Sequence, residues 1–256
     1  MAIYTNVEER YSVLDTGFSR TLVKQTIRAS SSVEINTTPD MKNVVTQGIG
    51  PQLLESQALG QSIGLGHHMI AVLPSDNMQE AIETLNSRGG GILRLGPHEY
   101  HIPYSLFLRS NIAFIGEGRD VTIIDFMDTT NNMNVIGTSG TKMINVFLRD
   151  FTVRDSRATA AIDVDFNDFF RMSNVRSTSN NGKGIRLHRT RFFNLTDTDG
   201  GSNSGNGIEI TGNLTNTTTN GVLFNCECDS NSGNGIQITD TGGGGVKDIN
   251  VIDCRT

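Results

Sequence analysis

Apolar residues recur in short clusters from about residue 92 to the C-terminus. Each cluster is three to eight residues long, and Gly, Asn, Asp, Ser and Thr fill the gaps between clusters. Short apolar runs bounded by turn-forming residues predict β-strands. No pattern of helical period separates the clusters, so the chain is not built from strand–helix–strand units.

One helix is predicted ahead of these strands, over about residues 76–88. Its apolar residues fall at i, i+3, i+4 and i+7 and therefore share one face: Met78, Ala81, Ile82 and Leu85. Gln79 follows Asp76 at the spacing of a capping box, and the run Gly89–Gly91 ends the helix.

An internal repeat organises the second half of the chain. The segment Ser202–Thr211 returns almost unchanged as Ser230–Thr239, and a weaker copy is Ser179–His188. The matching apolar positions lie 23, 23 and 28 residues apart: Ile162, Ile185, Ile208 and Ile236. A period of this length with two or three short strands predicts one turn of a parallel β-helix, in which turns stack about 4.8 Å apart.

Residues 1–73 differ from the rest because no period of 2 or 3.6 persists through them. We interpret them as an arm or attachment segment, ordered by what it touches, or alternatively as a flexible tail. A short helix is plausible around Gln52–Leu59. The predicted domains are therefore the arm, 1–73, and the β-helix, 74–256.

Four segments carry a family resemblance that covers roughly residues 75–256. The runs Asp76–Ile82, Gly89–Leu95, Leu106–Ile112 and Ile115–Gly118 resemble the first turns of the pectate-lyase-like right-handed β-helix proteins. The resemblance implies an all-β, right-handed parallel β-helix with an N-terminal amphipathic capping helix. That superfamily includes pectate lyases, polygalacturonases, alginate epimerases and bacteriophage tailspikes, so the resemblance specifies no single reaction.

The layout is most similar to that of the tailspikes. This resemblance implies a virion-associated protein that attaches to host-surface polysaccharide, with residues 1–73 docked on another virion protein. The alternatives are a free polysaccharide lyase or glycoside hydrolase, and a purely structural capsid or tail decoration. The start, Met1–Arg10, lacks a basic run followed by an apolar core, so we expect no signal peptide and an extracellular location only as part of a virion.

Charge and hydropathy exclude some classes of partner, and the cysteine and histidine content bears on disulfides and metal sites. The net charge is −6 with no basic stretch, which argues against nucleic acid, and the longest apolar run, Met69–Leu73, is too short to span a bilayer. Three cysteines form an odd set, which we interpret as buried thiols. His98 and His101 have no third ligand nearby in the sequence, so we expect them on the surface with no metal.

Stacking the repeats lines up candidate catalytic residues on one outer face: Asp163, Arg186, Glu209 and Gln237. Asp163 and Glu209 would lie two turns, or about 9.6 Å, apart, near the roughly 6.5–9.5 Å separation of inverting glycosidases. By resemblance to the family's lyases, the acids could instead hold calcium, with Arg186 as the base. The third interpretation is an exposed ladder of salt bridges without catalysis or any cofactor.

Other repeated residues are given structural roles. The asparagines near the second strand of each turn are expected to stack at a turn: Asn174, Asn194 and Asn225. The phenylalanines in these segments are expected to stack in the core: Phe170, Phe193 and Phe224. The chain ends inside an apparent strand, which would leave an unpaired edge, so we expect a homotrimer or a longer chain.

Overall fold

The computed structural model describes residues 68–256, except 138–140, 213–216 and 241–244, together with four strands nearer the N-terminus. Contacts divide the chain into two compact units, Met1–Ser62 and Ile63–Thr256. Each unit is described by itself.

The first unit contains an antiparallel sheet of four strands in the order β1-β2-β3-β4. These strands are β1 (Arg10–Asp15), β2 (Arg20–Ile27), β3 (Ser32–Asn36) and β4 (Lys42–Thr46). The sequence analysis did not predict these strands, because they do not belong to the repeat that organises the second half of the chain. The helix expected around Gln52–Leu59 lies outside the described residues.

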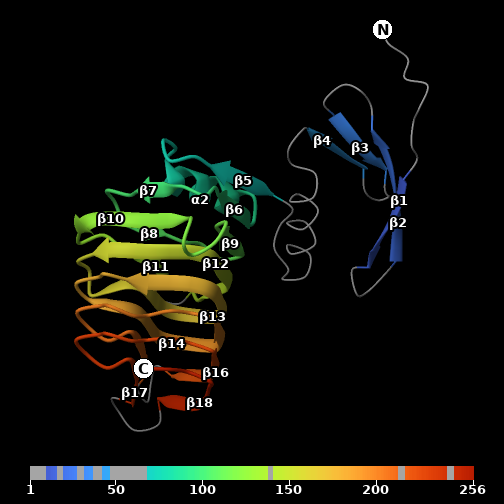
Figure 1. Ribbon diagram of the computed structural model, residues 1–256. Coiled ribbons are helices and arrows are strands. Elements are labelled where there is room, and N and C mark those ends of the chain that lie inside the picture. The colour runs from blue at the N-terminus through green and yellow to red at the C-terminus, as the bar shows by residue number, and fades with distance from the viewer. Residues whose placement is uncertain are drawn as a thin grey trace. The chain divides into compact units, whose positions relative to one another are not determined.

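The second unit is a parallel β-solenoid of about seven turns, as the fold class predicted (Figure 1). Its main path of paired strands runs β17-β15-β14-β13-β12-β9-β6-β5, and every pairing in it is parallel. The strands before the long central ones are β5 (Met69–Val72), β6 (Gly91–Leu95), β7 (Glu99–His101), β8 (Leu106–Phe107), β9 (Ile112–Ile115), β10 (Ile123–Thr129) and β11 (Met133–Ile136). The remaining strands are β12 (Met143–Ser156), β13 (Ala160–Thr178), β14 (Lys183–Thr196), β15 (Ile208–Gly212), β16 (Thr218–Phe224), β17 (Ile236–Asp240) and β18 (Val246–Ile252).

The apolar positions of the repeat stack in the register that their spacing predicted. Ile162 pairs with Ile185, Ile185 with Ile208, and Ile208 with Ile236. The first three side chains are fully buried, and Ile236 packs against the same core. This column of isoleucines confirms the sequence period and shows that the core runs through the centre of the stacked turns.

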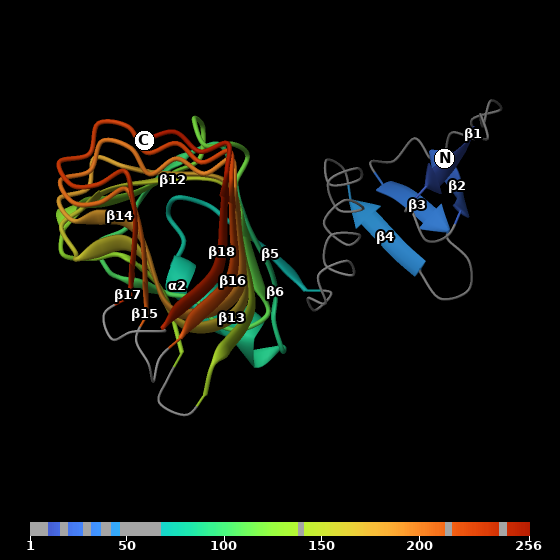
Figure 2. The ribbon, with the colours of Figure 1, turned by 90° about the horizontal axis from the view of Figure 1, so that it is seen from below.

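Helix α2 (Met78–Ser87) forms where the sequence predicted a helix and buries Met78, Ile82 and Leu85 in the core. Viewed along the stack, it lies within the outline of the solenoid, and it contacts β5, β6, β8 and β9 (Figure 2). The N-cap is Asn77, not Asp76, because the Asn77 side chain accepts the bond from the backbone N–H of Glu80. In the described part of the chain, no helix is long and apolar enough to cross a membrane.

The solenoid begins earlier than the predicted boundary at residue 74. Strand β5, inside the segment interpreted as an arm, pairs in parallel with β6 from Met69 opposite Ile92 to Val72 opposite Leu95. The sequence analysis did not assign β5 to the repeat, because it interpreted residues 1–73 as one segment without a sustained period. The role of the preceding residues as an attachment segment stays a prediction.

Candidate functional site

The residues predicted as catalytic lie in one column. Asp163 is opposite Arg186 in adjacent turns, Arg186 is opposite Glu209, and Glu209 is opposite Gln237. The sequence therefore predicted their alignment correctly. Both acids are buried, however, with only 7% of each residue exposed, so the expectation of an exposed ladder is wrong.

Each acid of this column is already paired with a cation. Asp163 receives two hydrogen bonds from Arg186, Nε to Oδ1 at 2.8 Å and Nη2 to Oδ2 at 2.7 Å. Glu209 pairs with Lys183 at 2.6 Å and accepts a bond from the Asn206 amide at 2.7 Å. Arg186, Lys183 and the Asn206 amide therefore bond the carboxylate oxygens that a calcium ion between the two acids would need. The catalytic role of the column stays a prediction.

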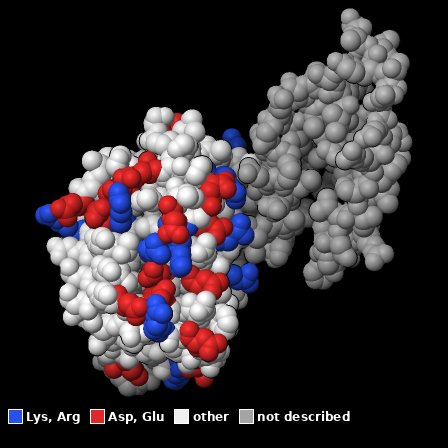
Figure 3. All heavy atoms as spheres, viewed as in Figure 1, with Lys and Arg blue, Asp and Glu red and all other residues white. Residues whose placement is uncertain are grey.

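Ion pairs of the same kind continue along β13 and β14. Arg191 and Lys142 both bond Asp168, at Nη2–Oδ2 2.5 Å and Nζ–Oδ1 3.2 Å. Burial raises the pKa of the Asp168 carboxyl, but the bonds from Arg191 and Lys142 outweigh it and lower that pKa below its ordinary value. Figure 3 shows such neighbouring charges of opposite sign on one face of the solenoid. Such pairs link adjacent turns, and their charges make the hydrogen bonds stronger than neutral ones.

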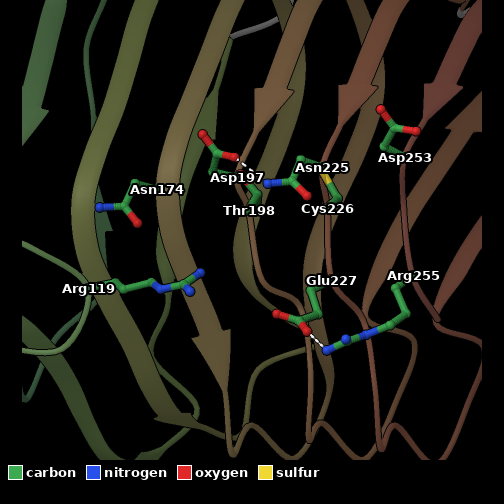
Figure 4. A pocket seen from close by; sticks show the side chains of 9 residues that line it. All are labelled: Arg119, Asn174, Asp197, Thr198, Asn225, Cys226, Glu227, Asp253 and Arg255. Atoms are coloured by element: carbon green, nitrogen blue, oxygen red, sulfur yellow. Dashed lines mark hydrogen bonds and ion pairs between the residues drawn. The ribbon is translucent and has the colours of Figure 1, made fainter.

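A polar groove lies on a different part of the solenoid surface. It has a volume of about 550 Å³ (Figure 4). Residues from four successive turns and one loop line it: Arg119, Asn174, Asp197, Thr198, Asn225, Cys226, Glu227, Asp253 and Arg255. All but Cys226 carry a polar or charged side chain, which is unusual for a site meant for an apolar ligand.

One wall of the groove is a column of left-handed corners. In this column, successive turns carry an Asp or Asn with φ between 50° and 62°: Asp150, Asn174, Asp197, Asn225 and Asp253. The register follows from the flanking pairs, since Ser173 is opposite Thr196 and Arg176 is opposite Asp199. Asp and Asn tolerate this backbone conformation better than other non-glycine residues, which explains their recurrence.

Hydrogen bonds fix the side chains of this column. The Asn174 amide donates to Asp150 at 2.7 Å, and the Asn225 amide donates to Asp197 at 2.6 Å. Each amide donates one of its two N–H groups to the preceding acid. The amide oxygens and the remaining carboxylate lone pairs therefore stay available to hydroxyl donors.

A column of charged residues runs two positions further along each turn, and two of its members, Glu227 and Arg255, line the groove opposite the corners. Backbone bridges place Arg176 opposite Asp199, Asp199 opposite Glu227, and Glu227 opposite Arg255. The Arg176 guanidinium bonds Asp199 at 2.8 Å, and Arg255 forms an ion pair with Glu227. Thr198 and Cys226, between the two columns, are buried and form the floor.

Arg119 reaches the groove from the loop between β9 and β10. Its side chain extends toward the middle of the groove (Figure 4). No carboxylate in the described part of the chain forms an ion pair with it, so its guanidinium is free to bind a ligand. The sequence did not single out Arg119 because it lies outside the repeat.

The predicted stacks of asparagines and of phenylalanines are each correct for two residues and wrong for the third. Asn174 and Asn225 belong to the corner column, but Asn194 is an exposed strand residue opposite Arg171 and Val222. Phe170 and Phe193 are buried as predicted, whereas Phe224 is exposed and lies opposite Thr196. Aligning the Phe-Asn dipeptide of Phe193 with that of Phe224 shifts the register by three residues, because Phe193 lies opposite Gly221.

A second polar cluster contains a histidine. His101 is exposed, as the sequence predicted, but its Nδ1 lies 3.7 Å from Glu99 and 3.9 Å from Asp125, two acids that the sequence did not place beside it. Arg154 bonds the same two acids at 2.6 and 3.0 Å. The guanidinium already supplies positive charge to both carboxylates, so we interpret the cluster as a network of ion pairs.

No protein-family model and no curated protein sequence matches the chain. Solved structures share the fold, and two of them are compared first. A putative glycosyl hydrolase from Parabacteroides merdae has a TM-score of 0.52 at 13% identity, over 69% of this chain and 87% of that one. The A-module of mannuronan C-5 epimerase AlgE6 from Azotobacter vinelandii has a TM-score of 0.50 at 19% identity, over 68% of this chain and 57% of that one. At these identities the likeness shows the fold alone.

A phage protein is also similar. The tailspike protein gp49 of Acinetobacter baumannii bacteriophage Fri1, a capsular polysaccharide depolymerase, has a TM-score of 0.42 at 12% identity. The match covers 99% of this chain and 60% of the tailspike.

Proposed function

We propose that the protein binds a polysaccharide along the polar groove. The groove itself carries the proposal, because its lining of Asn, Asp, Glu, Arg and Thr comes from successive turns of one solenoid. Such side chains supply the donors and acceptors that sugar hydroxyls need. Turns repeat about every 4.8 Å, so equivalent groups recur along the groove and suit a polymer better than a single small molecule.

The class of ligand to test first comes from proteins of the same fold. Two solved structures with TM-scores of 0.50 or more are named a putative glycosyl hydrolase and a mannuronan epimerase module. We therefore choose purified bacterial capsular polysaccharides and lipopolysaccharides, half of them containing uronic acids, as the test panel.

The test measures the affinity of the full chain for this panel by biolayer interferometry. Arg119→Ala removes the unpaired cation of the groove, and we expect it to weaken binding at least tenfold. Arg88→Ala is the matched control, since Arg88 lies at the end of α2 on the surface, outside the groove. Equal affinities for the wild type and Arg119→Ala, or no binding to any member of the panel, would contradict the proposal.

Binding without cleavage is the expected behaviour of this chain. The panel is incubated with the protein, with and without calcium, and assayed for new reducing ends and for absorbance of unsaturated uronates. We expect neither. Cleavage that disappears in Asp163→Asn or Glu209→Gln would instead identify the chain as a polysaccharide hydrolase or lyase that acts through the buried column.

The wider role that we propose is attachment of a virion to host-surface polysaccharide. The similarity in sequence layout to tailspikes supports this role. The proposed role includes assembly as a homotrimer and docking of the N-terminal segment on another virion protein. Light scattering of the full chain tests the oligomer: a mass of three chains is expected, and a stable monomer would contradict it.

A further inference from the structure

A second column of left-handed corners runs along the solenoid, and two of its members are unusual. Its residues have φ between 54° and 61°: Asn111, Asn145, Phe169, Phe192, Asn220 and Asp248. The flanking pairs set the register, with Ile144 opposite Asp168 and Thr219 opposite Lys247. Four corners thus carry Asn or Asp, and two consecutive corners carry Phe.

A phenylalanine in this backbone conformation is strained. Asn and Asp stabilise the left-handed region with their short polar side chains, whereas a bulky residue there costs about 1–2 kcal/mol. The neighbouring turns show that the same corner forms with Asn145 and Asn220. Phe169 and Phe192 are therefore not needed for the turn itself.

Both phenylalanines also face solvent. Phe169 is 48% exposed and Phe192 is 45% exposed. Their rings stack with centroids 5.1 Å apart and planes inclined by 12°. Backbone strain and apolar exposure thus coincide at two adjacent corners, which is the pattern of a site kept for a ligand.

The surroundings of this aromatic pair are cationic. The Arg191 guanidinium lies 5.8 Å from the Phe192 ring centre, and Arg191 and Lys142 share the single acid Asp168. Arg171, two residues after Phe169, is exposed and pairs with no acid in the described part of the chain. Three cations against one carboxylate leave a local charge of +2 on a chain whose net charge is −6.

We propose that Phe169 and Phe192 form a second subsite, which binds an acidic sugar unit of the polysaccharide. The C–H groups of the sugar ring pack on the phenyl rings, and its carboxylate pairs with Arg171 and Arg191. The inference rests on the proposed polysaccharide-binding function and assigns its ligand to the acidic class. The positive local charge favours an acidic sugar over a symmetric contact with the same patch of a second copy, which would bring like charges together.

The test replaces both phenylalanines with the residue of the neighbouring corners. The double variant Phe169→Asn/Phe192→Asn should melt at or above the temperature of the wild type, because it removes the strain. Phe107→Asn is the matched control, since Phe107 is 47% exposed and lies outside the column. The uronate-containing polysaccharides of the panel and their carboxyl-reduced forms are the probes.

We expect the wild type to bind the uronate polymers at least tenfold more tightly than their carboxyl-reduced forms. The double variant and Arg171→Gln should lose this preference, while Phe107→Asn keeps it. An unchanged preference in the folded double variant would overturn the inference, as would a wild type without the preference. An oligomer that dissociates in the double variant would also overturn it, because a second copy would then cover the pair. If only Arg119→Ala loses binding, the proposed groove is supported and the aromatic subsite is not. If only the double variant loses binding, the proposed groove is contradicted.

Discussion

Asn180 donates a hydrogen bond from its amide Nδ2 to Oδ1 of Asn203, 2.9 Å away on the next turn of the solenoid. Both residues are 2% exposed. The Asn203 amide in turn donates to the backbone carbonyls of Ser177, Gly200 and Gly201. This buried ladder of amides satisfies carbonyl groups where the chain turns and strands cannot pair them.

Asn203→Ala should therefore destabilise the solenoid unit by about 1–3 kcal/mol, because it leaves several buried backbone groups unpaired. Urea unfolding followed by circular dichroism measures the change. Asn194→Ala is the control, since Asn194 is an exposed strand residue and its loss should leave the unfolding midpoint unchanged. Equal effects of the two substitutions would show that the ladder does not stabilise the fold.

Gly221→Ala should also destabilise the protein, by about 1–3 kcal/mol. Phe193 lies opposite Gly221, and a Cβ at this glycine would stand only 2.0–2.5 Å from ring atoms of Phe193. The second substitution Phe193→Leu shortens the obstructing side chain. We expect the double variant to lose less stability than the sum of the two single variants, and strict additivity would contradict the predicted clash.

Acid should weaken the fold partly through Asp168. Its pKa is lower in the folded protein than the ordinary value of about 4 for an aspartate, so its ion pairs stabilise the fold above that value. This contribution is lost as the pH falls through the folded pKa. In Asp168→Asn, the free energy of unfolding should fall less steeply below pH 4 than in the wild type, as denaturant titrations at several pH values will show. Parallel pH profiles would be the contrary result.

Two of the thiols should resist modification. Burial raises the pKa of Cys226 and of Cys228 to about 12. At pH 8 the native protein should therefore react with iodoacetamide first at the more exposed Cys254, and at the other two only after unfolding. Because these folded pKa values are raised, the contribution of the two thiols to stability should be constant below about pH 8.5 and should be lost as the pH rises toward 12. Rapid alkylation of Cys228 in the native state, seen by peptide mass spectrometry, would contradict its burial.

The sequence predicted the fold because its signal is periodic. The isoleucine spacing set the register of the turns, and that register placed Asp163, Arg186 and Glu209 in one column. The sequence did not predict that Arg186 would form its ion pair with Asp163 and not with Glu209. That outcome depends on Lys183 and Asn206, which bond Glu209. Which partner a long side chain takes is a tertiary property.

The groove was harder to predict because its residues lie at corners and not in strands. Asn174, Asp197 and Asn225 share a backbone conformation that only their positive φ values reveal, and different residue types can adopt it. The same Phe-Asn dipeptide lies within a strand at Phe193, whereas Phe224 ends its strand and Asn225 forms the corner. Arg119 comes from a loop that does not belong to the repeat.

A crystal or cryo-electron microscopy structure of the full chain with its tightest-binding oligosaccharide would test most directly whether the groove holds a polysaccharide. We predict sugar density along the wall formed by Asn174, Asp197 and Asn225, with the Arg119 guanidinium bonded to a sugar oxygen. Density elsewhere on the solenoid, with the groove holding only solvent at a saturating oligosaccharide concentration, would contradict the proposed function.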